Sequence, residues 1–459
     1  MYETVFRHML LPAFESLIKG RSTIADLRRL ERQQWLAPGQ LRQIQLDRLN
    51  GLLARAWADV PFLRTYWGDH GCRPGALRDA SELSDYPILT KQLIRQNFDG
   101  MTSPSERARA LEKTTGGSTG EPFRLRYSVA SYAARNAAMW RGYRWAGTDL
   151  GRRTLYLWGV APNMSAKARL REWLFHTAYN RRMLNSFELT RDNGVRYAAT
   201  INAYRPRTLV AYVAPAVALA QWLLDSGTPV AAPDSIITGA EALNDSQRAL
   251  IEKAFGAPVF NTYGAREFGL MGAECKERAG MHVTADQIVI ETVDDAGRPV
   301  RDQPGHVLVT DTTNDAMPFV RYRNGDVATC TSAVCPCGRG LPLLASIQGR
   351  TLDLIRTRDG RLLPGEFFPH VLNNCDAIDQ YQVVQHDLDR IEVKMLLRPG
   401  WPSVDLAHIR QALTTALGPA IRLELNIVDS LPLTAAGKRR VTVSHVGPLD
   451  AGERHASRN

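Results

Sequence analysis

The chain of 459 residues has few cysteines, no long apolar run and no block of like charges. Its apolar stretch from Leu209 to Leu224 is too short for a bilayer span and contains a proline, so we expect no transmembrane segment. The N-terminus, MYETVFRHMLLPAFESLI, has an early glutamate and no small-residue cleavage site, which disfavours a signal peptide and favours a cytoplasmic protein. We expect a packed helix there, with a peripheral amphipathic helix as the alternative.

Positive charge is abundant but scattered. The formal net charge is +10, yet the arginines form only short doublets such as Arg28–Arg29 and Arg439–Arg440. Because no basic run or nucleic-acid-reading motif is found, we expect no nucleic-acid partner. A moderate positive field suits small polyanionic ligands equally well.

The order of apolar segments predicts an α/β protein with two domains. Residues 1–100 have a helical period, and from 120 to 330 short apolar runs alternate with helical segments, which is typical of a largely parallel sheet. Antiparallel strands are expected within 282–300 and 305–313. A boundary near Gln348 to Asp353 then separates a large domain, 1–348, from a small mobile α+β domain, 349–459, that acts as a lid.

The stretch TTGGSTGEP combines glycines, which let backbone N–H groups approach an anion, with hydroxyl donors. Glu121 and Pro122 follow its last glycine, so the lysine of a Walker loop is missing. By itself the stretch is either a phosphate-binding loop or a turn between two strands.

Further motifs follow in a fixed order. TGAEAL places Glu241 after an apolar strand, NTYGAREFG places Tyr263 and Glu267 after another, and strand ends are where α/β sheets build their sites. RYRNGDVA offers Asp326, IQGRTLDLI offers Arg350, and LPLTAAGKRR offers Lys438. Singly, each motif also reads as turn glycines, a solvated acid or a surface lysine.

Together, the motifs TTGGSTGEP, YGARE, RYRNGD, QGR and AGKRR closely resemble the signature series of the acyl-adenylate-forming superfamily. The nearest likeness is the phenylacetate–CoA ligase branch and its relatives associated with capsular polysaccharide synthesis. The resemblance covers nearly the whole chain, and DVPFLRTYW and LSDYPILTKQLIRQN also match that branch.

The resemblance implies that a carboxylic acid attacks ATP to give an acyl-adenylate, and that coenzyme A then displaces AMP. An amine or a carrier-protein thiol is the alternative acceptor. We expect the phosphates to lie against the loop formed by Thr114, Thr115, Gly116, Gly117, Ser118, Thr119 and Gly120. No nucleophile from the protein is needed, and a monomer or homodimer is expected.

The resemblance also assigns roles to single residues. Tyr263 and Gly264 would flank the adenine, together with Glu241 in the nucleotide site, and Glu267 would hold Mg²⁺. Asp326 would bind the ribose hydroxyls, with Arg350 near the ribose or phosphate. Lys438 would arrive with the small domain and contact the carboxylate and the α-phosphate. The acyl pocket is expected between 158–163, 212–215 and 238–241.

Three departures from the family pattern concern the hinge, the phosphate contact and the acceptor. Leu352 stands where the hinge usually has its first acid, and Arg266 stands where threonine or serine is common. The usual glutamate of the P-x-x-I-E element is absent from LPGEFFPHV. The residue about which the small domain would rotate is therefore not assigned. A thiol as the acyl acceptor is also less strictly implied.

Four of the six cysteines cluster in sequence with a histidine. Cys275 and His282 have a C-x₆-H spacing, and Cys335 and Cys337 form a Cys-Pro-Cys-Gly turn. Three thiolates and one imidazole fit a closed, structural Zn²⁺ site, with Cys330 as the substitute ligand. Four unrelated reduced thiols are the alternative; members of the phenylacetate–CoA ligase branch carry a similar site.

Overall fold

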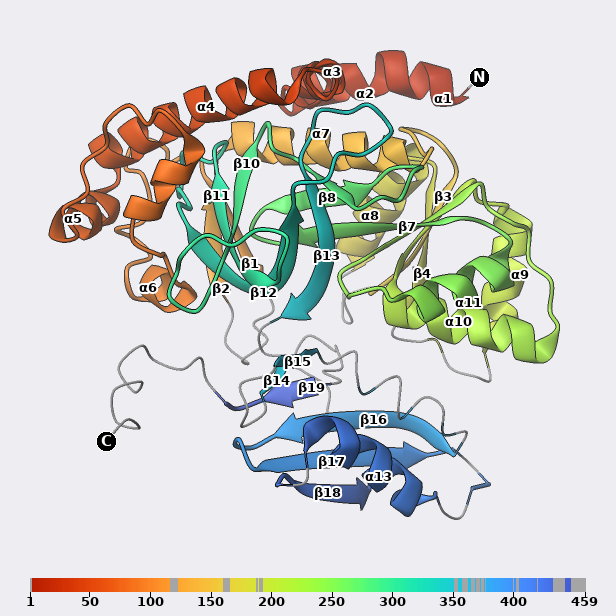
Figure 1. Cartoon of the computed structure of the whole chain (residues 1–459). Coiled ribbons are helices and arrows are strands. Elements are labelled where there is room, and N and C mark those ends of the chain that lie inside the picture. The colour runs from red at the N-terminus through yellow and green to blue at the C-terminus, as the bar shows by residue number, and fades with distance from the viewer. Residues whose placement is uncertain are drawn as a thin grey trace, which may run out of the picture.

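Figure 1 shows the chain as a computed structural model, with a large body of sheet and helices and a smaller layer of strands below it. The structure describes residues 2–115, 123–159, 166–186, 189, 193–350, 354–356, 362–364, 368, 372, 375, 377–398, 400–401, 404–418, 420–431 and 442–446. Among these residues, no helix has both the length and the apolar character needed to cross a bilayer.

The N-terminal part is helical, as its periodicity predicts; residues 2–59 lie along the top of the body in Figure 1, and the later helices lie at its left side. The N-terminal helix, residues 2–18, joins α1 (Tyr2–Val5), η1 (Phe6–Leu10), α2 (Leu11–Ala13) and η2 (Phe14–Ile18), in which η1 and η2 are π-helical. It is followed by α3 (Thr23–Gln33), α4 (Pro38–Asp59), α5 (Pro61–Asp69), η3 (Ala80–Asp85) and α6 (Lys91–Gln96). Proline disfavours helical backbone in the preceding residue, and Val60 is extended, so α4 ends there.

One large sheet forms the centre of the body. Among the described residues its eleven strands lie in the order β10-β11-β12-β13-β9-β8-β7-β6-β5-β3-β4. The parallel half contains β3 (Thr154–Trp158), β4 (Arg181–Asn185), β5 (Thr208–Tyr212), β6 (Ser235–Gly239) and β7 (Val259–Ala265). The antiparallel half contains β8 (Gly269–Glu274), β9 (Met281–Val283), β10 (Ile288–Val293), β11 (Gly305–Asp311), β12 (Tyr322–Thr331) and β13 (Leu343–Arg350).

The two halves meet at β7, which pairs parallel with β6 and antiparallel with β8. Helices connect and cover the strands: α7 (Val129–Trp145), α8 (Ala166–Ala178), α9 (Gly194–Tyr204), α10 (Val213–Ser226) and α11 (Asp245–Phe255). Helix α7 packs closely on β8, since a Cβ atom on Gly142 would clash with the Leu270 side chain. The expected strand–helix alternation and the added antiparallel strands are therefore confirmed.

The C-terminal residues form a second, smaller sheet. It has the order β18-β17-β16-β19 and is covered by α13 (Leu406–Leu417). Its strands are β16 (Ile378–Gln385), β17 (Arg390–Leu397), β18 (Arg422–Ile427) and β19 (Thr442–Ser444), and the short hairpin β14 (Leu354–Arg356) and β15 (Leu362–Pro364) precedes them. Side chains such as Val383, Val393 and Leu413 form a core separate from that of the large sheet. This is the α+β arrangement expected from the sequence.

Candidate functional site

Two paired strands flank the glycine-rich stretch in the sequence. Strand β1 (Leu111–Thr115) pairs antiparallel with β2 (Phe123–Tyr127), and Thr115 is opposite Phe123. Thr114 and Thr115 therefore end β1, whereas Gly116, Gly117, Ser118, Thr119 and Gly120 lie outside the described residues. A strand follows the loop where a Walker loop would have a helix.

Lys113 precedes this loop on the inner face of the hairpin. Side chains alternate along a strand, so Lys113 shares its face with Phe123, Leu125 and Tyr127, all of which are buried. Its ammonium nitrogen lies over two tyrosine rings, 5.5 Å from the ring centroid of Tyr127 and 4.8 Å from that of Tyr132. Lys113 itself is exposed, so its ammonium group is accessible to a ligand while it lies beside these rings.

Further cations surround Lys113. The Arg135 guanidinium lies 3.9 Å from the Tyr127 ring centroid and pairs with Asp311 at 2.7 Å. Burial lowers the pKa of Lys113, and the nearby Arg135, Arg266 and Arg21 lower it further. Because these cations disfavour one another, an anion bound among them would be stabilised.

The turn between β7 and β8 carries Arg266 and Glu267. Tyr127 donates a hydrogen bond to the carbonyl oxygen of Arg266, which ties the turn to the β1–β2 hairpin. Gly264 is required there, because a Cβ atom would lie 2.5 Å from the carbonyl oxygen of Gly269. Glu267 is half-buried, and its charge contributes to raising the pKa of Tyr127, after burial as the largest cause.

Tyr263 and Asp326 meet although they are far apart in sequence. The Tyr263 hydroxyl donates to Asp326 Oδ2 at 2.7 Å, and Asn324 Nδ2 donates to the same oxygen at 2.7 Å. Asn324 Nδ2 also lies 2.9 Å from the Tyr263 hydroxyl. We call Tyr263, Asn324 and Asp326 the polar cluster. In the ladder between β12 and β13, Asp326 is opposite Arg350, so the backbone of Arg350 lies beside it.

Sequence reasoning assigned no role to Asn324. It lies two residues before Asp326 in RYRNGD, and its side-chain oxygen accepts the backbone N–H of Asp326 at 3.0 Å. Asparagine commonly bonds the backbone two residues further along the chain, so the motif itself contained this signal. The bond fixes the orientation of the Asp326 backbone in the polar cluster.

Glu241 follows the carboxyl end of β6, as expected. Its side chain contacts the first turn of α10. Its Oε2 accepts the backbone N–H of Ala214 at 2.6 Å, in the first turn of that helix. Ala240 has a left-handed φ of 69°, a strained conformation that aims the next residue. Glu241 therefore interacts favourably with the dipole of α10.

Two aromatic residues of the expected acyl pocket are in contact. The rings of Trp158 and Tyr212 stack with centroids 3.8 Å apart at the ends of β3 and β5. Burial raises the pKa of Tyr212, while Arg266 acts to lower it. The two rings thus lie near the β7–β8 turn. Residues 160–163 of the expected pocket and Lys438 lie outside the described residues, as does the Arg350 side chain.

The four predicted metal ligands come together from two segments of the chain. Ligand atoms of Cys275, His282, Cys335 and Cys337 all lie within 4.8 Å of one another. Cys275 Sγ is 3.6 Å from Cys335 Sγ, and Cys337 Sγ is 3.2 Å from His282 Nε2. A tetrahedral Zn²⁺ site separates sulfur and nitrogen ligands by about 3.3–3.8 Å, so this set, the Cys/His cluster, fits zinc.

The Cys/His cluster is nearly closed to solvent. Cys275 and His282 are fully buried, and Cys335 is 2% exposed. Burial lowers the pKa of His282 to about 4, with the Arg339 guanidinium lowering it further, so the imidazole is neutral and able to bind a metal. The proposed substitute ligand, Cys330, instead lies on β12 opposite Leu344 and is outside the cluster.

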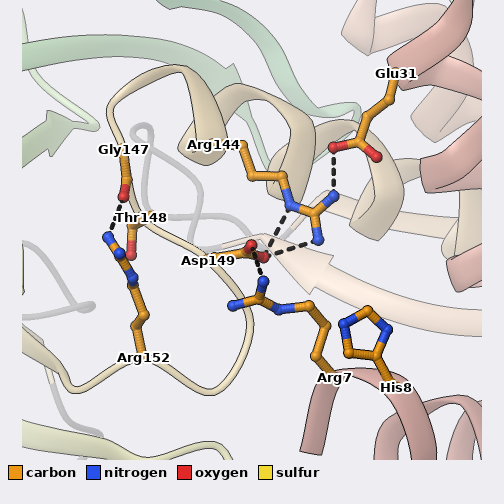
Figure 2. A pocket seen from close by; sticks show the side chains of 8 residues that line it. All are labelled: Arg7, His8, Glu31, Arg144, Gly147, Thr148, Asp149 and Arg152. Atoms are coloured by element: carbon orange, nitrogen blue, oxygen red, sulfur yellow. Dashed lines mark hydrogen bonds and ion pairs between the residues drawn. The ribbon is translucent and has the colours of Figure 1, made fainter. Parts of the chain in front are cut away.

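A pocket of about 450 Å³ lies away from these groups, between the N-terminal helix and the end of α7 (Figure 2). Its charges bind one another: Asp149 accepts from Arg7 at 2.9 Å and from Arg144 at 2.8 Å, and Arg144 also pairs with Glu31. These ion pairs attach the N-terminal helix to α7. The pocket is a structural junction and does not belong to the candidate site.

Comparison with known proteins agrees with this arrangement. Residues 355–445 match the family model described as the CapK C-terminal domain. The chain is 26% identical over 376 residues to the phenylacetate-coenzyme A ligase of Thermus thermophilus. The matched residues make up 78% of this chain and 81% of the relative. It is 23% identical over 374 residues to the protein CapK of Staphylococcus aureus, covering 80% of this chain and 81% of the relative.

A solved structure shares the fold over most of both chains. The 2-hydroxyisobutyryl-CoA ligase in its postadenylation state superposes with a TM-score of 0.71, at 19% identity, over 90% of this chain and 91% of the ligase. The fold is therefore that of this ligase, and the order of the sequence motifs resembles that of the acyl-adenylate-forming superfamily. In sequence the chain is similar to phenylacetate–CoA ligases and to CapK.

Proposed function

We propose that the protein activates a carboxylic acid with ATP and transfers the acyl group to coenzyme A, releasing AMP and pyrophosphate. The observation that carries this proposal is the meeting of Tyr263 with Asp326 beside the β7–β8 turn. Both residues lie in motifs of the adenylate-forming superfamily, and the relatives described above include CoA ligases.

In the proposed site the polar cluster binds the nucleoside. Asp326 is partly accessible, and a carboxylate, which only accepts hydrogen bonds, suits ribose hydroxyls. Tyr263 and Asn324 hold the carboxylate in one orientation before the nucleotide arrives. The Tyr263 ring then lies beside the adenine, with the Gly264 backbone allowing a close approach.

The phosphates would extend toward the β1–β2 hairpin. The glycine-rich stretch between β1 and β2 would offer N–H donors to a polyanion, and the cations Lys113 and Arg266 would offer positive charge. Glu267 fits Mg²⁺, which commonly takes one carboxylate together with substrate phosphates. When bound, the ion would neutralise charge on the phosphates.

The first step joins the acid to the α-phosphate. A carboxylate oxygen attacks the α-phosphorus, the bond to the bridging oxygen breaks, and pyrophosphate leaves. We propose that Lys438 and Arg350 offset the charge that develops there, with Lys438 carried by a lid domain that begins at residue 349. In the second step the CoA sulfur attacks the acyl carbon, AMP leaves and the thiol proton is released.

The Cys/His cluster would hold Zn²⁺ in a structural role. Four protein ligands fill a tetrahedral shell, which leaves no open position for a substrate. Because Cys275 follows β8 directly, the cluster would brace the strands that carry the β7–β8 turn. We also place the reaction in the cytoplasm, where ATP and CoA are available.

The first experiment is an assay of pyrophosphate release with a panel of carboxylic acids. We expect release that requires both ATP and one class of acid, and mass spectrometry should detect the acyl-CoA when CoA is added. The Lys438→Ala variant serves as the inactive control. If pyrophosphate is released but only an amine or a carrier protein accepts the acyl group, the CoA step is wrong; no release with any acid would contradict the whole proposal.

A further inference from the structure

Large apolar side chains are exposed along the N-terminal helix, residues 2–18. They are Tyr2, Val5, Met9, Leu10, Leu17 and Ile18. Leu17 is 83% exposed and Ile18 is 71% exposed, values more typical of polar surface residues. Isolated exposed apolar residues are common in proteins, but a row of them along one helix marks an interaction surface.

Helix α8 extends this row. Leu170, Trp173, Leu174 and Phe175 are all exposed, with Trp173 at 61%. Tyr2 lines a shallow cavity of about 490 Å³ together with Trp173 and Leu174, and its hydroxyl donates to the carbonyl oxygen of Ala178. The start of the N-terminal helix therefore lies against α8, and we call the exposed apolar side chains of these two helices the apolar face.

The N-terminal helix is anchored from its other side. Phe6 and Leu11 are buried in a core that includes residues of α7, and Arg7 pairs with Asp149, as Figure 2 shows. Glu15 is buried and accepts a hydrogen bond from Thr23 at 2.6 Å. Because these contacts already fix the helix, its exposed residues are held outward in a defined orientation.

Positive charge accompanies the apolar face. Lys19, Lys167, Arg169 and Arg171 are exposed on the same two segments. The acidic residues there have partners: Glu15 bonds Thr23, Glu3 lies 4.0 Å from Arg152, and Glu172 lies 3.3 Å from His176. The surface thus combines apolar side chains with cations, within a chain whose net charge is +10.

We propose that the apolar face docks the protein on a membrane surface that contains anionic lipids. Apolar side chains of an interfacial helix enter the boundary between headgroups and acyl chains, and flanking lysines and arginines bind the anionic headgroups. A second copy of the chain would bring the same positive charges to the contact, whereas anionic lipid brings the opposite charge.

The test is flotation of the full-length protein with lipid vesicles. We expect binding to vesicles that mix phosphatidylglycerol with phosphatidylcholine, weaker binding at high salt, and little binding to phosphatidylcholine alone. Absence of binding to the anionic vesicles at low salt would overturn the proposal. Equal binding to both kinds of vesicle would also overturn it, because the cations would then have no role.

Paired variants locate the contact. L17S/I18S and W173S/L174S should each weaken vesicle binding by about tenfold or more, since each removes two apolar side chains from the interface. V334S is the matched control, because Val334 is 77% exposed elsewhere on the chain and its loss should leave binding unchanged. Thermal unfolding checks that all variants fold.

Self-association is measured in parallel by analytical ultracentrifugation. If the wild-type protein forms a dimer that L17S/I18S converts to a monomer, while neither binds vesicles, the apolar face is covered by a second copy and the membrane proposal is wrong. Vesicle binding that V334S reduces as much as L17S/I18S does would likewise place the contact elsewhere.

Discussion

The polar cluster and the Cys/His cluster differ in how they meet solvent. Both join residues about 60 positions apart: Tyr263 and Asp326 in one, Cys275 and Cys335 in the other. In the polar cluster Asp326 remains partly accessible, whereas in the Cys/His cluster Cys275 is fully buried and Cys335 nearly so. An open arrangement suits a ligand that enters and leaves, and a closed one suits a ligand that stays.

This difference separates the effects of mutation. Loss of a partly exposed polar group lets water replace it, so the folded state changes little while binding suffers. Loss of a buried ligand leaves unsatisfied groups inside the protein, so stability suffers first. Variants of the two clusters should therefore divide into those that lose activity and those that lose stability.

The largest effect on activity in this comparison is expected for Asp326→Ala. The variant loses the carboxylate proposed to accept from ribose hydroxyls, and charged hydrogen bonds are worth enough to lower kcat/KM for ATP by about a hundredfold. The thermal midpoint should change by less than about 2 °C. ATP–pyrophosphate exchange and thermal unfolding measure the two quantities.

The control is Asp225→Ala on α10, where the carboxylate accepts only a surface bond from Gln221 at 2.6 Å. Its exchange rate should match that of the wild type. A strongly lowered thermal midpoint for Asp326→Ala, together with a normal exchange rate for the folded fraction, would make the polar cluster structural and remove the contrast.

Cys335→Ser should have the opposite profile. The wild-type protein is expected to contain about one equivalent of zinc, and this variant little, because a closed site needs all four ligands. We expect the thermal midpoint to fall by about 10 °C. Metal analysis and thermal unfolding measure these effects, with Cys375→Ser as the control outside the cluster. A wild-type protein without bound metal would show that the cysteines are unrelated thiols.

Much of the architecture could be predicted from the sequence because its strands are buried and bounded by clear breaks. The segments RTLVAYV and AVALAQWLLDSG predict a strand and a helix, and they form β5 and α10. In the same way LDLIRTRDGRLLP predicts the hairpin of β14 and β15, and VDLAHIRQALTTALG predicts the helix α13. The hydrophobic pattern does not predict that the parallel and antiparallel strands form one sheet through β7. That arrangement depends on pairing between segments that are distant in sequence.

The sequence predicts the site residues that belong to motifs. It does not predict contacts that depend on the register between paired strands. Tyr263 and Asp326 were expected in one site, and the structure brings them together. The inward direction of Lys113 follows from the register of β1 against β2, which no local pattern reveals. Glu241 was expected at a strand end, but its contact with α10 needs the left-handed backbone at Ala240.

Lys113→Met tests the charge beside the glycine-rich loop. We expect ATP to bind about tenfold more weakly while AMP binds nearly as before, because Lys113 is proposed to face the phosphates that AMP lacks. Arg124→Met is the matched control: it removes a cation from the same hairpin, but from the outer face, where Arg124 pairs with Glu112 at 2.7 Å.

Calorimetry of ATP and AMP binding measures both affinities, and Lys113→Arg should restore most of the ATP affinity. Equal losses for ATP and AMP would show that Lys113 supports the fold of the hairpin rather than the phosphates. If the wild-type protein binds neither nucleotide, the proposed function itself is contradicted. This outcome differs from failure of the role of Lys113 alone, in which the wild-type protein still binds both nucleotides.

Tyr263→Phe should produce the smallest change. The ring that lies beside the adenine is retained, while the hydroxyl loses its hydrogen bonds to Asp326 and from Asn324, so we expect KM for ATP to rise about threefold with kcat unchanged. Asn324 still donates to the same Asp326 oxygen at 2.7 Å and limits the loss of orientation. Steady-state kinetics at varied ATP measure the effect. A loss as large as that of Asp326→Ala would mean that the hydroxyl itself contacts the substrate, and the polar cluster would then have two residues that bind the nucleotide directly.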